Sequence, residues 1–147
     1  MQNLIKNSKL TTAITPAAGV AAATDLEGTV LDMAGFDSVF MQVRMGVITA
    51  AAVTSIKAQQ GDLADGSDMA DLLGTNILVA ADDDNQIFGI DLVKPSKRYV
   101  QLYVDRATQN AVVSSATYLQ YGASKVPITQ DSGVTVETHV SPAEGTA

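Results

Sequence analysis

Apolar and polar residues alternate along most of the middle of the chain. The segment 38–47 shows this most clearly, because one face carries Val39, Met41, Val43, Met45 and Val47. The segment 99–105 repeats the pattern, with its aliphatic residues at every second position. A period of two residues is typical of a strand with one buried face. The pattern therefore predicts a β-strand in both segments.

Shorter segments of the same kind predict further strands, separated by residues that favour turns. The predicted strands span residues 24–33, 38–47, 53–60, 77–80, 87–92, 99–105 and 112–121. A short basic turn joins 87–92 to 99–105, which we interpret as a hairpin. The segment 67–74 differs, because Ser67 suits a helix N-cap and Gly74 suits the position after a helix end. It predicts one or two helical turns.

Strands at this spacing are typical of an all-β sandwich, jelly roll or barrel. We expect one antiparallel, jelly-roll-like β-sandwich over residues 24–121. The flanking segments 1–23 and 122–147 are interrupted by Pro and Gly, so we expect extended N- and C-terminal arms there. The predicted core residues are Val39, Met41, Val43, Ile56, Ile77, Phe88, Ile90, Val100, Leu102, Val104 and Leu119.

The net charge, the lack of a long apolar segment and the absence of Cys exclude several classes of function. The formal net charge is −7, and nine Lys and Arg residues are mostly scattered along the 147 residues. A nucleic-acid binder needs a basic stripe, so we expect no nucleic-acid partner. No segment approaches the roughly 20 apolar residues that span a bilayer, so we expect no membrane contact. The absence of Cys excludes disulfides and thiolate chemistry.

The acidic loops are the first candidate site. Asp62, Asp65, Asp68 and Asp71 recur at every third position, and residues 82–84 are all Asp. Loop carboxylates are ligands that Ca²⁺ prefers, but the order of an EF-hand loop is absent. Asp also favours turns because it bonds its own backbone. We interpret these residues as turn chemistry and expect neither a metal nor a cofactor.

His139 is the one imidazole of the chain, and a Ser-His-Asp triad would have to use it. It lies near the C-terminus, where little would hold catalytic geometry, so we interpret it as an ordinary exposed residue. No Gly-rich phosphate loop is present, and nothing selects a pair of carboxylates for glycoside hydrolysis. We therefore expect no catalytic residue and no enzyme activity.

The basic turn is the remaining candidate. Lys94, Lys97 and Arg98 form the one cationic cluster, and Tyr99 and Tyr103 follow it. Arg beside Tyr can form a surface that stacks on a sugar or binds an anion. A solvated turn explains the same residues, and we favour that interpretation.

Extended segments of this length at both ends are unusual for a small domain. Such arms are typical of segments that become ordered when they bind a partner. In the C-terminal arm, Val134, Val136 and Val140 fit one face of a strand, with Glu137 and His139 on the other. Such a strand suits the edge of a neighbour's sheet. We expect both arms to be mobile in the isolated protein and to make much of the contact in an assembly.

Several segments carry a resemblance to a known family. They are Gly-Phe-Asp-Ser-Val-Phe-Met-Gln-Val at 35–43, Ile-Lys-Ala-Gln-Gln at 56–60, Gln-Ile-Phe-Gly-Ile-Asp at 86–91 and Lys-Arg-Tyr-Val-Gln-Leu at 97–102. Over residues 24–121 the chain resembles the capsid decoration or cement proteins of tailed bacteriophages. The resemblance implies a structural β-sandwich that is made in the host bacterial cytoplasm and sits on the exterior of the virion capsid. It also implies that the protein binds the major capsid protein across capsomer junctions and self-associates there as a dimer or trimer.

Two other functions remain open at this point. A carbohydrate-binding jelly-roll module would use Lys94, Arg98, Tyr99 and Tyr103 to bind sugar. A head–tail connector or tail structural protein is also expected to be small, acidic and rich in strands.

Overall fold

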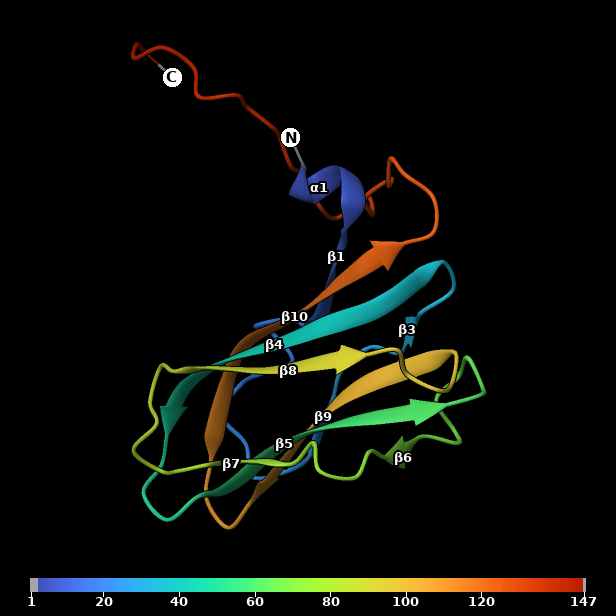
Figure 1. Ribbon diagram of the computed structural model, residues 1–147. Helices are drawn as coiled ribbons and strands as arrows, with labels where there is room; N and C mark the ends of the chain where they lie inside the picture. Colours follow the sequence, from blue (N-terminus) through green and yellow to red (C-terminus); the bar gives the residue numbers. More distant parts are fainter. Residues whose placement is uncertain (1–2, 147) are drawn as a thin grey trace.

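The computed structural model describes residues 3–146, which form two antiparallel β-sheets packed face to face (Figure 1). Sheet A contains, in spatial order, β1 (Lys9–Ile14), β10 (Ala111–Ala123), β4 (Phe36–Ile48) and β8 (Ile87–Val93). Sheet B contains β2 (Leu26–Glu27), β3 (Leu31–Asp32), β9 (Tyr99–Ala107), β5 (Val53–Gly61), β6 (Ala70–Asp71) and β7 (Ile77–Val79). The short helix α1 (Leu4–Asn7) precedes β1. No helix of the described residues is long and apolar enough to cross a membrane.

The strand order is that of a jelly roll. The long strands alternate between the sheets along the chain, with β4, β8 and β10 in sheet A and β5 and β9 in sheet B. The first strand, β1, pairs with the last strand, β10, and β10 lies between β1 and β4 in sheet A. This neighbourhood of first and last strands is a feature of jelly-roll topology. The all-β sandwich predicted from the sequence is confirmed. The predicted hairpin is wrong, because β8 and β9 belong to different sheets and the basic turn crosses between them.

The core lies between the inner faces of the two sheets. The aliphatic residues that alternate along β4 and β9 are completely buried, as predicted; they are Val39, Met41, Val43, Val100, Leu102 and Val104. Ile56 and Ile90 are also buried, whereas Ile77 and Phe88 are half-buried and pack against this core. Alternation therefore identified most of the core correctly.

Leu119, which was predicted in the core, and Val47, which was placed on the same face as Val39, do not face the core, and β-bulges explain both differences. The pairing of β10 with β4 shifts register on either side of Val113. A bulge adds one residue to one strand and so reverses which residues face inward beyond it. Beyond this bulge Tyr118 and Gln120 are buried, whereas Leu119 lies on the outer face. Beyond the shift in β4, Val47 is 64% exposed and Ile48 is buried.

The N-terminal region is less of an arm than we expected. Residues 9–14 form β1 and pair with β10, so this part of the predicted arm belongs to the sandwich. The predicted strand 24–33 is instead two short strands, β2 and β3, separated at Gly28. Gly28 N still donates to the Leu102 carbonyl of β9 at 2.8 Å, and a side chain supplies the next bond, because Gln101 Nε2 donates to the Gly28 carbonyl at 2.7 Å. A Cβ atom on Gly28 would lie 2.6 Å from the Tyr118 hydroxyl oxygen.

The helix predicted at 67–74 is also wrong, because side-chain bonds within the loop and pairing with β5 hold the backbone in another conformation. The carboxylate of Asp65 accepts hydrogen bonds from the backbone N–H and hydroxyl of Ser67. The carboxylate of Asp68 closes the preceding loop by accepting from the N–H groups of Asp62 and Leu63. Residues 70–71 then pair with β5 as β6. Side-chain bonds of this kind compete with a helix for the backbone.

Candidate interaction surfaces

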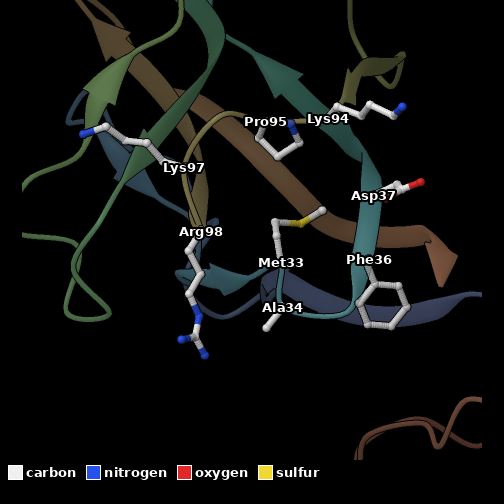
Figure 2. Close-up of a pocket in the computed structure, with 8 residues that line it drawn as sticks. All are labelled: Met33, Ala34, Phe36, Asp37, Lys94, Pro95, Lys97 and Arg98. Atoms are coloured by element: carbon white, nitrogen blue, oxygen red, sulfur yellow. The ribbon is translucent and has the colours of Figure 1, made fainter. Parts of the chain in front are cut away.

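The basic turn lines an open hollow of about 450 Å³ between β3, β4 and the turn itself (Figure 2). Its lining residues are Met33, Ala34, Phe36, Asp37, Lys94, Pro95, Lys97 and Arg98. The sequence thus correctly placed the three cations close together. Figure 2 shows that their charged ends point in different directions, so they do not converge on one point in the hollow.

Two of these cations already have acidic partners. Arg98 binds Asp32 with both carboxylate oxygens, at 2.9 Å from Nε and 2.7 Å from Nη2. This hydrogen bonding holds the pKa of Asp32 below its ordinary value. Lys97 Nζ lies 2.9 Å from a carboxylate oxygen of Asp62, which raises the pKa of Lys97. The hollow is therefore poorly suited to binding an anion, since its charge is largely compensated.

Tyr99 and Tyr103 share the outer face of sheet B, and neither lines the hollow. The guanidinium carbon of Arg98 is 5.2 Å from the ring centroid of Tyr99, and Lys57 Nζ is 4.7 Å from that of Tyr103. The Tyr103 hydroxyl also donates to the Asp25 carboxylate at 2.5 Å. That hydrogen bond raises the pKa of Tyr103 to about 12. Each ring thus has a cation over it, where a stacked sugar would have to compete.

A second open hollow, of about 460 Å³, adjoins this face. Its lining includes Lys57, Asp71 and Asp105. Lys57 Nζ lies 2.6 Å from an Asp71 carboxylate oxygen, whose pKa is lowered by Lys57 and by Gln59. Polar side chains therefore gather around this hollow, although Lys57 and Asp71 already bond each other.

Some of the acidic residues bond the backbone of their own loops, whereas Asp62 and Asp71 form ion pairs with Lys97 and Lys57. Besides Asp65 and Asp68, the carboxylate of Asp83 accepts from Ala80 N at 2.8 Å and that of Asp84 accepts from Ile48 N at 2.7 Å. Among the described residues, no three His, Cys, Asp or Glu side chains gather at a possible metal position. These carboxylates organise loops, and the structure brings them to no common centre.

His139 lies in the C-terminal segment and is exposed. Its Nε2 atom is 3.0 Å from a carboxylate oxygen of Glu137, two residues away. Within the part of the chain that the structure describes, this is the one polar side-chain contact that His139 makes. The structure does not bring His139 to the other candidate residues.

A latch between the C-terminal segment and β1 was not predicted from the sequence. Gln130 accepts a hydrogen bond from Leu10 N at 3.0 Å through Oε1, and its Nε2 donates to the carbonyls of Ile5 and Ser8. Asp131 adds an ion pair to Lys9 at 2.8 Å, which lowers the pKa of Asp131. We call Gln130 and Asp131 the latch. They cover the outer edge of β1 and fix the point at which the remaining chain leaves the sandwich.

Arg106 was also missed, although it falls in phase with Val100, Leu102 and Val104 along β9. Its side chain is 3% exposed, and its guanidinium donates to the carbonyls of Thr24, Val20 and Ala111 at 2.8–3.0 Å. Burial lowers the pKa of Arg106. The signal in the sequence is a charged residue at an inward position of a strand whose inward face is otherwise apolar. It holds the segment before β2 against the sandwich.

Comparison with known proteins adds a likeness in fold. No family model and no curated protein matches the sequence. Among solved structures, the fold is similar to that of XepA, an exported protein of the phage PBSX, with a TM-score of 0.50. The two sequences are 15% identical, and the match covers 96% of this chain and 46% of XepA. The chain thus spans about half the length of XepA, and the likeness concerns the fold.

Proposed function

We propose that this protein is a structural component of a tailed-phage virion. Specifically, we propose a decoration or cement protein that binds the major capsid protein on the outside of the icosahedral shell, across capsomer junctions. The observation that carries the proposal is the C-terminal segment, which is latched to β1 at Gln130 and then runs away from the sandwich (Figure 1). A fixed departure point followed by a long exposed segment suits contact with a neighbouring molecule.

Two further features support the proposal. The fold is shared with a protein of the phage PBSX over nearly the whole chain. The net charge of −7 favours a basic surface as the binding site and disfavours packaged nucleic acid. We assign the protein no catalytic step and no membrane contact. A cement protein needs only interface area, near 1,600 Å² for a standard interface, and an extended segment supplies area at low mass.

The direct test is binding to empty shells of a tailed phage. We expect the full chain to sediment with the shells and to raise their melting temperature. A chain truncated after Asp131 keeps the latch, so it should fold normally but bind shells at least about tenfold more weakly. Leu73→Ser serves as the matched control, because Leu73 is fully exposed on the loop between β6 and β7. Equal binding by the truncated and full chains would contradict the role of the C-terminal segment.

A carbohydrate-binding module is the second candidate, and the polar hollow beside Lys57 and Asp105 is the observation that favours it. The cations over Tyr99 and Tyr103 count against it, because they occupy the aromatic faces that sugars use. A glycan array distinguishes the two functions. Specific glycan binding without shell binding would replace our proposal. A protein that binds only isolated tails or connectors would instead be a tail or head–tail protein.

A further inference from the structure

The outer edge of β8 carries a row of unpaired backbone groups. Lys94 N donates to the Asp37 carbonyl and Met45 N donates to the Gln86 carbonyl, each at 3.0 Å, on either side of the paired segment. Because hydrogen-bonded pairs alternate in an antiparallel ladder, the even-numbered residues of β8 bond to β4. The N–H and C=O groups of Ile87, Gly89, Asp91 and Val93 therefore point away from the sheet. All four of these residues are exposed.

The other edges of the two sheets are covered or broken. The edge of β1 is covered, because Leu10 N donates to Gln130 and the Ala13 carbonyl accepts from Thr29 N. One edge of sheet B consists of β2 and β3, and the other of β6 and β7, and each of these strands has only two or three residues. β8 has seven residues, and Asp91 is its one charge. Long apolar edges of this kind pair readily with another strand.

A segment suited to such pairing lies in the same chain. Residues 134–140 read Val-Thr-Val-Glu-Thr-His-Val, and β-branched residues of this kind favour strands. The structure places no strand within residues 124–146. Val134 and Val136 are half-buried, whereas Val140 is 72% exposed. We call residues 134–140 the tail segment.

The tail segment cannot reach the free edge of β8 in its own molecule. The latch holds Asp131 beside β1, and β8 is the strand at the opposite side of sheet A. Strands are spaced about 4.8 Å apart, so a strand added outside β8 would lie roughly 19 Å from β1. The two residues between Asp131 and Val134 allow a span of only about 10 Å. Pairing between the tail segment and β8 therefore requires two molecules.

We propose that the tail segment of one copy adds as a strand to the free edge of β8 in a second copy. Each molecule then donates one segment and accepts another, so that either two copies exchange segments about a twofold axis or several copies form a head-to-tail ring if its rotation closes. Backbone hydrogen bonds give such a contact its strength, and the exposed Ile87 and Val93 side chains add apolar area. This inference does not depend on the proposed function, since it concerns the isolated protein.

Analytical ultracentrifugation over a range of protein concentrations tests the proposal. We expect the full chain to self-associate and the chain truncated after Asp131 to be monomeric. Ile87→Pro removes an outward N–H without breaking a bond to β4, and it should weaken association at least about tenfold. Ile87→Ser removes the same apolar side chain but keeps the N–H, so it should associate more tightly than Ile87→Pro. Circular dichroism checks that each variant is folded.

Disulfide mapping gives a second measurement, because the chain has no native Cys. Asp91→Cys and Val136→Cys are prepared separately, mixed and oxidised. We expect the mixed disulfide to exceed the same cross-link between Val136→Cys and a Glu27→Cys control on β2. Any one of four results would overturn the inference. The full chain could stay monomeric, or truncation could leave its association unchanged. The two Ile87 variants could associate equally, or the cross-link could show no preference for β8. A tail that binds shells but not a second copy would overturn it while leaving the proposed function standing.

Discussion

Replacing Tyr118 with Phe is the most informative single change for the stability of this fold. The Tyr118 hydroxyl accepts a hydrogen bond from Leu102 N at 2.8 Å and donates one to the Thr29 carbonyl at 3.0 Å. The side chain is completely buried. It therefore joins β9 to the irregular segment beside Gly28, where ordinary strand pairing is interrupted. Phe keeps the ring and its packing but leaves both backbone groups without this partner.

The size of the effect follows from the burial of those groups. Leaving a buried polar group unsatisfied costs about 1–3 kcal/mol. The bond from Leu102 N is fully buried, whereas the bond to the Thr29 carbonyl is partly accessible to water. We therefore expect Tyr118→Phe to lower the free energy of unfolding by about 2–3 kcal/mol. For a domain of this size, the melting temperature should fall by about 4–10 °C.

Urea denaturation followed by far-ultraviolet circular dichroism measures this loss directly. Tyr121→Phe is the matched control, because the Tyr121 hydroxyl also makes a hydrogen bond, to Asp91 at 2.6 Å, but on the exposed face of sheet A. We expect that control to lose less than about 1 kcal/mol, with the same dependence on urea. If the two variants lose the same free energy, the bridging role of the Tyr118 hydroxyl is refuted.

Three further predictions use the same reasoning. Gly28→Ala should lose about 1–3 kcal/mol of stability by calorimetry, and less in the Tyr118→Phe background, because its Cβ would meet that hydroxyl oxygen at 2.6 Å. Arg106→Met should lose about 2–4 kcal/mol by urea denaturation, since the Thr24 and Val20 carbonyls lose their donor and the Ala111 carbonyl keeps only its 3.5 Å bond from Ala22 N. The pKa of Asp131 is lowered by Lys9, so the latch contributes stability above pH 3.8 and loses it as the pH falls below that value. Hydrogen exchange at the Leu10 amide, read by NMR, should accelerate in that acidic range beyond its ordinary pH dependence, and Asp131→Asn should show the faster exchange already at neutral pH.

The parts of the fold that the sequence predicted are those in which burial alone decides the structure. Val39, Met41 and Val43 follow the alternation that a half-buried strand imposes, so their inward direction was predicted correctly. Leu119 was assigned the wrong face because a bulge leaves no mark in the hydrophobic pattern. Inward positions beyond that bulge hold Tyr118 and Gln120, whose polar ends bond to the backbone of the opposite layer. Only the completed fold supplies those partners.

The contacts at the candidate surfaces also include some that the sequence predicts and some that it does not. Lys94, Lys97 and Arg98 are neighbours in sequence, so their closeness in space could be predicted. That Asp32 neutralises Arg98 could not, because the two are 66 residues apart. The latch depends on Gln130 reaching residues more than 100 positions earlier. A single glutamine in a loop carries no local sign of such a contact.

The net charge of the chain predicts opposite dependences on salt for the two contacts that we propose. Every copy carries a net charge of −7, so two copies repel one another, and salt screens that repulsion. Backbone pairing between the tail segment and β8 involves few charges, so self-association should tighten as the salt concentration rises. Attraction between an acidic protein and a basic shell surface should instead weaken, because the same screening removes the attraction. If both contacts weaken together in salt, one electrostatic contact explains both, and the pairing of tail segment and β8 is not needed.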